Sequence, residues 1–221
     1  ARGQTDVSLS IWNKAINVAE QFPARDSRLA RSLDRVGEIL YGIEKYGQAE
    51  MLWWRSLQIK LGVLGTFHQA VAYTANNLAK LHYLLGRYTE AESYTMKCRQ
   101  IYQHCYGVEH QSVATCMHNL ASLYHVQGRY AEAEEQYKCA LKIRKKLLGA
   151  ENPETLSVTK SYADLLKTIG RHAEAHDLNS MANGLVSGSW KAIVIPENQK
   201  LADTDDICMF CGVDLNGKER C

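Results

Sequence analysis

The heptapeptide Gly86–Glu92, GRYTEAE, returns twice along this chain at a constant spacing. It reappears as GRYAEAE at Gly128–Glu134 and as GRHAEAH at Gly170–His176, each copy standing 42 residues after the previous one. A degenerate copy, EKYGQAE, stands one period earlier at Glu44–Glu50. Self-similarity at a fixed period of this size is typical of a solenoid whose small repeated units stack on one another.

Two further landmarks keep the same 42-residue step. The first is a glycine near the end of each unit, and the second is a His-Gln or Asn-Pro dipeptide a few residues after it. They stand at Gly65, Gly107 and Gly149, and at His68-Gln69, His110-Gln111 and Asn152-Pro153. Three independent landmarks with one period indicate an internal repeat.

Each unit is expected to form two amphipathic helices. Between residues 112 and 126 the apolar side chains follow the i, i+3, i+4, i+7 spacing of a helix, and Gly128 then interrupts the pattern. The pattern resumes at Tyr130 and ends at Gly149. Alanines recur where paired helices must approach closely, at Ala79, Ala121 and Ala163 and at Ala91, Ala133 and Ala175. The sequence therefore predicts an all-α fold, a right-handed superhelical α-solenoid of antiparallel helix hairpins.

The period also sets the expected boundaries. A lone helix over residues 6–21 comes first, and it is expected to cover the open end of the stack. Four hairpins follow, over residues 27–63, 69–105, 111–147 and 153–184, and the last of them is the expected distal cap. Residues 185–207 are expected to form a linker, and 208–221 a separate segment. The residues expected in the core include Cys98, Cys105, Cys116, Cys139, Trp53, Tyr88, Tyr130 and Leu141.

Composition and motifs argue against several function classes. The 26 basic and 24 acidic residues give a net charge of +2, and this balance does not indicate a surface that binds nucleic acid or a membrane. The apolar runs are too short for a transmembrane helix, and the cysteines lack the dense pattern of a secreted disulfide framework, so a cytoplasmic location is expected. The spacing suggests no nucleophile with its base and no glycine-rich phosphate loop, so the chain is not expected to be an enzyme. Because the chain starts at Ala1 without an initiator Met, we expect a fragment of a longer protein.

The repeated unit resembles a tetratricopeptide repeat, in its Asn76–His82 stretch followed by Gly86–Glu92. The 42-residue length and the Leu-Gly-x-x-His element at Leu64–His68 resemble the subtype found in kinesin light chains and their bacterial relatives. The resemblance covers about residues 6–184. Two departures fall in the outer repeats, Glu44 at the turn glycine and Ser161 at the position of Asn77 and Asn119.

The resemblance implies a concave groove, lined by the first helices of the hairpins, in which an extended or short helical peptide lies. Transferring the family's groove positions places Arg31, Asp34, Glu38 and Tyr41 in the first row, which is expected to be acidic. The peptide-binding residues expected in the later rows are Tyr73, Asn76, Asn77, Lys80, Tyr83, Thr115, His118, Asn119, Ser122, His125, Lys160 and Lys167.

The chemistry of these candidates leaves alternatives open. A carboxamide both donates and accepts, so Asn77 and Asn119 suit pairing with a peptide backbone of any sequence, or else they brace neighbouring helices. The three lysines suit an acidic ligand or a terminal carboxylate, or else they form an ordinary solvated face. His118 and His125 are expected to make contacts rather than to catalyse.

Three cysteines near the end of the chain are candidate zinc ligands. Cys208 and Cys211 form a Cys-x2-Cys-Gly knuckle, and Cys221 supplies a third thiolate. The segment resembles a zinc ribbon that lacks its fourth ligand, and the alternatives are free thiols or a redox pair. No other cofactor is expected.

The sequence therefore predicts a protein–protein interaction scaffold that binds a partner peptide and acts as a monomer. Two alternatives remain open. One is a regulatory or sensor module of a larger protein, and the other is an array that assembles with its own copies.

Overall fold

The computed structural model describes Ser10, Lys14, Asn17 and residues 27–189, with side chains described as far as Ser180. The helix expected over residues 6–21 lies outside the described residues, apart from the three isolated positions. The tail from residue 190 onward also lies outside them, and with it the expected linker and the candidate zinc ligands.

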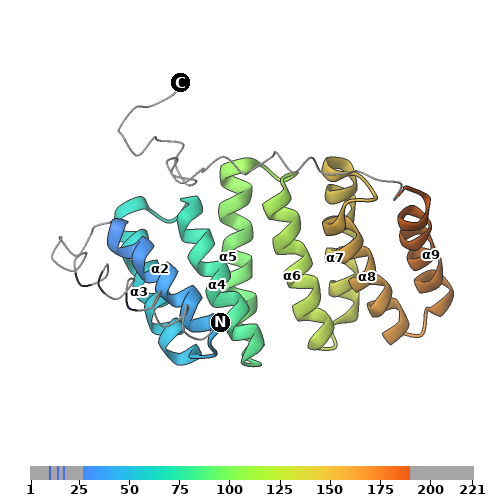
Figure 1. Cartoon of the computed structure of the whole chain (residues 1–221). Coiled ribbons are helices and arrows are strands. Elements are labelled where there is room, and N and C mark those ends of the chain that lie inside the picture. The colour runs from blue at the N-terminus through green and yellow to red at the C-terminus, as the bar shows by residue number, and fades with distance from the viewer. Residues whose placement is uncertain (1–9, 11–13, 15–16, 18–26, 190–221) are drawn as a thin grey trace, which may run out of the picture.

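Eight helices follow one another through residues 27–189, and no strand occurs in this part of the chain. They form four antiparallel hairpins that stand side by side in chain order (Figure 1). The expected all-α solenoid of helix hairpins is confirmed. The helices are α2 (Ser27–Gly42), α3 (Tyr46–Leu64), α4 (Gln69–Leu84), α5 (Tyr88–Tyr106), α6 (Gln111–Val126), α7 (Tyr130–Leu148), α8 (Pro153–Thr168) and α9 (His172–Ser189).

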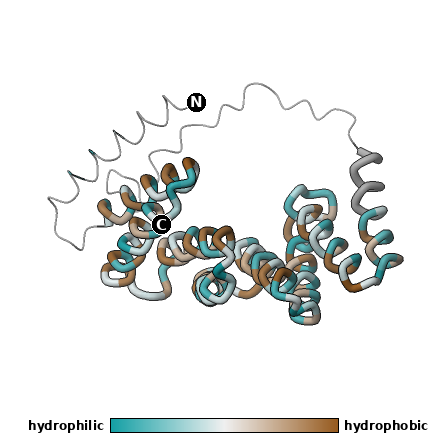
Figure 2. Tube along the Cα trace, turned by 90° about the horizontal axis from the view of Figure 1, so that it is seen from below, coloured by the Kyte–Doolittle hydropathy of each residue, from teal (hydrophilic) through white to brown (hydrophobic). Residues whose placement is uncertain are grey.

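The stack has a consistent packing order. Each first helix packs against its partner in the hairpin, and α4, α6 and α8 also pack against the second helix of the preceding hairpin. Seen from below, the hairpins follow a curved line (Figure 2). The first helices α6 and α8 also contact each other directly. Among the described second helices, α3, α5, α7 and α9, no pair is in comparably close contact. First helices therefore lie on the inner side of the curve, and we call the surface of α2, α4, α6 and α8 the inner face.

The repeated His-Gln and Asn-Pro dipeptides start the first helices. Nδ1 of His68 accepts the backbone N–H two residues on at 3.1 Å, and His110 does the same at 3.2 Å. Asn152 caps α8 through its side-chain oxygen at 2.9 Å. Each side chain satisfies one of the amide groups that a helix start leaves without a partner. This capping requirement explains why the dipeptide recurs with the period of the fold.

The turn inside each hairpin needs a left-handed residue. Gly128 takes φ 75° between α6 and α7, and the corresponding glycines of the second and fourth hairpins behave alike. Glu44 fills this position in the first hairpin and takes φ 63°. Among the described residues it is the only non-glycine with a positive φ, a conformation that is unfavourable for a residue with a Cβ.

The interiors of the first and third hairpins each hold one bulky side chain opposite one small residue. Trp53 of α3 is 2% exposed and lies against Gly37 of α2, and Tyr137 of α7 is 1% exposed within the hairpin that carries Ala121. Gly37 occupies the alanine position of the other repeats, because a Cβ there would lie 2.5 Å from Trp53 Nε1.

Four of the eight expected core residues are buried, one is half-buried and three are exposed. Cys98, Cys116, Trp53 and Leu141 are buried as predicted, and Tyr88 is half-buried. The prediction was wrong for Cys105, Cys139 and Tyr130, which are exposed. Cys139 precedes the core residue Ala140 and so points off the buried face, and Cys105 lies in the last turn of α5, where its Sγ donates to the Phe67 carbonyl at 3.2 Å.

The last helix continues past its expected end at residue 184, since α9 runs to Ser189. Gly184 and Gly188 lie within it, at a cost of about 1 kcal/mol each relative to alanine, which a helix tolerates.

Candidate functional site

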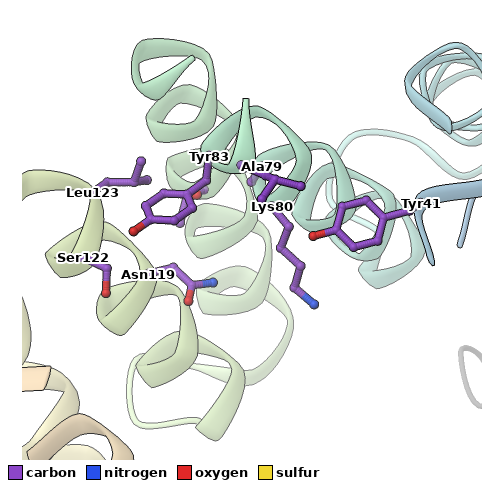
Figure 3. A pocket seen from close by; sticks show the side chains of 9 residues that line it. Tyr41, Ala79, Lys80, Tyr83, Asn119, Ser122 and Leu123 are labelled. Carbon is purple, nitrogen blue, oxygen red and sulfur yellow. The ribbon is translucent and has the colours of Figure 1, made fainter. Parts of the chain in front are cut away.

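One pocket of about 300 Å³ opens on the inner face between α4 and α6 (Figure 3). Tyr41 reaches toward it from the end of α2, and Thr95 of α5 lies at its buried side. The pocket therefore joins three successive hairpins. Its lining residues are Tyr41, Ala79, Lys80, Tyr83, Leu84, Thr95, Asn119, Ser122 and Leu123.

The pocket combines polar tips with apolar walls. The Tyr83 ring extends from α4 toward Ser122 and Asn119 of α6, and Lys80 extends between α4 and Tyr41 (Figure 3). Lys80 is exposed and has no acidic partner among the described side chains. Ala79, Leu84 and Leu123 supply the apolar surface. Such a site suits a ligand group that is partly apolar and carries an acceptor or a negative charge.

Four of the predicted peptide-binding residues meet in this pocket, namely Lys80, Tyr83, Asn119 and Ser122. Tyr41 from the first row joins them. The prediction missed Ala79, Leu84, Thr95 and Leu123 as lining residues, because apolar and buried positions were assigned to the core alone. The signal that pointed to them was the small residue Thr95 at a position where the neighbouring repeats carry Trp53 and Tyr137.

The other candidates on α4 lie beside the pocket and are partly engaged. Tyr73 donates its hydroxyl to Glu38 of α2, and burial together with this hydrogen bond raises the pKa of Tyr73 to about 12. Asn77 is 8% exposed, and its Nδ2 finds no hydrogen-bond partner of normal geometry among the described residues. Asn76 is half-buried.

The first row is not the free acidic surface that we expected. Asp34 is 4% exposed and forms a buried ion pair with Lys60 of α3. Thr74 of α4 donates to the same carboxylate at 3.0 Å, and Lys60 also donates to the Ala70 carbonyl at 3.2 Å. Asp34 therefore joins the first hairpin to the second instead of facing a ligand. The repeat pattern did not reveal this, because Tyr102 stands at the Lys60 position one period on.

The candidates on α6 and α8 pair with one another. Nε2 of His118 lies 3.1 Å from Ser161 Oγ, and one heptad on, Nε2 of His125 lies 3.2 Å from Thr168 Oγ1. One heptad before His118, Gln111 donates to Glu154 at 2.9 Å. We call these three contacts the α6–α8 seam.

Three remaining candidates differ in availability. Thr115 accepts a hydrogen bond from Arg144 at 3.1 Å, and Lys167 pairs with Asp164 at 2.9 Å. Lys160 is exposed.

Burial determines the protonation state of His118, the central histidine of the α6–α8 seam. His118 is half-buried, and burial together with the nearby Arg144 guanidinium lowers its pKa to about 4. The ring is therefore neutral near pH 7 and can both donate and accept.

Within residues 27–180 no three histidine, cysteine or acidic side chains gather in a way that could hold a metal ion. The candidate zinc ligands Cys208, Cys211 and Cys221 lie beyond this part of the chain, so the zinc site remains a prediction.

A family model described as tetratricopeptide repeat matches residues 29–103, 70–146 and 117–182. The chain belongs to the tetratricopeptide repeat family. These overlapping matches extend over all four hairpins.

Several solved structures share this architecture. The kinesin-light-chain-type protein of Podosopora anserina with nearly identical TPR-like repeats is 19% identical, covering 86% of this chain and 91% of that one, with a TM-score of 0.75. BtubC (BKLC) from P. vanneervenii is 21% identical, covering 84% of this chain and 74% of that one, with a TM-score of 0.77. MamA is 14% identical, covering 84% and 91%, with a TM-score of 0.59. At these identities the likeness establishes the fold alone. None of the curated proteins matches the sequence.

Of the helices that the structure describes, none has the length and apolarity needed to cross a membrane.

Proposed function

We propose that this tetratricopeptide repeat chain is a protein–protein interaction scaffold, and that it binds a segment of a partner protein on its inner face at the α4–α6 pocket. The observation that carries the proposal is the pocket itself, which places the amine of Lys80 and the polar tips of Asn119 and Ser122 around apolar walls. Binding without chemistry is the proposed role, since the pocket groups form no set of nucleophile, base and orienting acid.

The charge of the site favours a negative ligand group. Lys80 has no acidic partner among the described residues, and the acidic side chains of α2 are already paired, Asp34 with Lys60 and Glu38 with Arg35. A carboxylate of the partner, from a side chain or from the chain end, would fit the Lys80 amine. Because Lys80 is exposed, this contact would affect orientation and association rate more than affinity.

The seam limits where the partner lies. His118 and His125 already use one ring nitrogen each, Nε2, on Ser161 and Thr168. A ligand would have to break these hydrogen bonds to use the same atoms. We therefore place the partner segment over α2, α4 and α6, with Lys160 and Lys167 at the edge of the site.

The two asparagines would play unequal roles. Asn119 lines the pocket and is half-buried, so its carboxamide is available to a peptide backbone. Asn77 is more deeply buried, at 8% exposed, so its unpaired Nδ2 is less accessible to a ligand than the carboxamide of Asn119.

A selection from a random peptide-display library against the whole 221-residue chain tests the proposal. The bound peptides are then measured against Lys80→Ala and Asn119→Ala, each expected to weaken binding about tenfold, which corresponds to roughly 1.4 kcal/mol. Lys142→Ala on α7 is the matched control, because Lys142 is exposed and lies outside the pocket. Selected peptides that bind all three variants equally would contradict the proposed site.

The scaffold is proposed to act as a monomer. Sedimentation of the chain over a hundredfold concentration range should give one molecular mass, and association between copies would favour the assembling array instead.

A further inference from the structure

The pocket exists because one position in the repeat is small. Residues 53, 95 and 137 are separated by one period each, and they are Trp53, Thr95 and Tyr137. In the first and third hairpins this residue places a large ring inside the hairpin, next to the first helix. In the second hairpin Thr95 is 1% exposed, and its hydroxyl donates a hydrogen bond to the Ala91 carbonyl at 2.7 Å.

The surroundings of the two rings predict where a ring at position 95 would lie. Trp53 packs against Gly37, and its ring lies tilted against that of Tyr41 with the ring centroids 5.7 Å apart. One period later these positions are Ala79 and Tyr83, and both line the pocket.

A comparison with the third hairpin places a ring at position 95 in the same pocket. The Tyr137 hydroxyl lies 3.2 Å from Ser122 Oγ, and one period earlier the Ser122 position is Lys80, a further lining residue. Two independent comparisons therefore place the ring that position 95 lacks among lining residues of the pocket, of which Ala79, Lys80 and Tyr83 are labelled in Figure 3.

We infer that the pocket receives an aromatic side chain of the partner, which takes the place of the ring that position 95 lacks. The inference rests on the proposed function, because it names the group by which the partner segment is anchored. An apolar cavity of about 150 Å³ accommodates benzene, so the volume of about 300 Å³ seen here holds a phenol or an indole. A partner's ring enters from the inner face, opposite to the direction in which Tyr137 extends from α7, so its tip points toward Thr95 and its backbone end lies near Lys80.

The chain offers a way to close the pocket from within. Thr95→Tyr restores the ring, and tyrosine is the suitable choice because Ala79 corresponds to Ala121, the residue in the hairpin of Tyr137. Thr95→Val is the matched control, since it keeps the size of the side chain and leaves the pocket open. Ala79→Leu closes the same space from α4, so the test stands even if the tyrosine variant misfolds.

The probes are N-acetyl-tyrosinamide, N-acetyl-tryptophanamide and, as an aliphatic reference, N-acetyl-leucinamide, titrated into the whole chain and followed by NMR on the Leu84 and Leu123 methyl groups. We expect the two aromatic amides to bind with millimolar Kd and the leucine amide at least fivefold more weakly. Thr95→Tyr and Ala79→Leu should weaken aromatic binding at least tenfold, and Thr95→Val less than twofold. Equal binding of the leucine amide, or unchanged aromatic binding when the pocket is closed, would overturn the inference.

Failure of this inference is distinguishable from failure of the proposed function. Selected peptides that depend on Lys80 and Asn119 but bind Thr95→Tyr as well as the parent chain would keep the scaffold and remove the aromatic anchor. Aromatic amides that bind the pocket while no peptide can be selected would remove the peptide site and keep the pocket.

Discussion

Arg129 donates from one guanidinium nitrogen to Glu92 at 2.8 Å across the boundary between the second and third hairpins. The two residues are 37 positions apart, and both belong to copies of the repeated heptapeptide. The same pairing recurs at both other hairpin boundaries, as Arg87–Glu50 and Arg171–Glu134, each at 2.8 Å. The arginine of each heptapeptide thus binds the last glutamate of the preceding copy. Lys45 and His176 replace these residues at the outer positions of the array.

This pairing predicts coupling between Arg129 and Glu92. Arg129→Gln and Glu92→Gln should each lower the urea midpoint of unfolding, and the double variant should lower it by less than the sum, because either change alone removes the contact. Glu135→Gln, on an exposed position of α7, is the control and should leave the midpoint unchanged. Additive midpoint shifts in the double variant would show that the two side chains do not interact.

The strained turn in the first hairpin predicts a stabilising substitution. Glu44 takes φ 63° where the other repeats place glycine, and a Cβ in this conformation costs roughly 1–2 kcal/mol. Glu44→Gly removes this cost and adds some unfolded-state entropy, so we expect a net gain of about 0.5–1 kcal/mol in the free energy of unfolding. Gly128→Ala, the reverse change in the third hairpin, should destabilise the chain by a similar amount. Urea denaturation measures both, and a loss of stability in Glu44→Gly would contradict the argument.

The helix pairing of Trp53 with Gly37 predicts a clash and its rescue. In Gly37→Ala the new Cβ would lie 2.5 Å from Trp53 Nε1, so we expect a loss of about 1–3 kcal/mol in the free energy of unfolding. Adding Trp53→Tyr should recover part of the loss, because alanine and tyrosine occupy these positions together in the third hairpin, as Ala121 and Tyr137. Circular dichroism during urea unfolding reports both steps. A double variant less stable than Gly37→Ala would rule out this explanation.

The sequence alone was sufficient to predict the fold, but it did not predict which candidate side chains remain available to a ligand. Repeats of Gly86–Glu92 identify the hairpins because period and helix spacing are local properties of the chain. Whether Asp34 faces a ligand depends on Lys60, which lies in another helix and has no counterpart one period on. The same holds for His118, whose partner Ser161 is set by the approach of α6 to α8. Contacts of this kind depend on tertiary distances that no periodicity encodes.

The depressed pKa of His118 predicts a pH-dependent stability with a definite sign. The unfolded chain protonates this histidine near a pKa of about 6.5, whereas burial and Arg144 lower the folded pKa to about 4. Since the unfolded state binds the proton first, stability is fully present above pH 6.5 and is lost as the pH falls toward 4. The loss due to His118 is at most ~3 kcal/mol. Urea unfolding of the parent chain and of His118→Asn at pH 7 and pH 4.5 isolates this contribution, because the other histidines remain in both. The gap between the two chains should shift in favour of His118→Asn on acidification, and a gap that stays constant would show that His118 titrates normally in the folded protein.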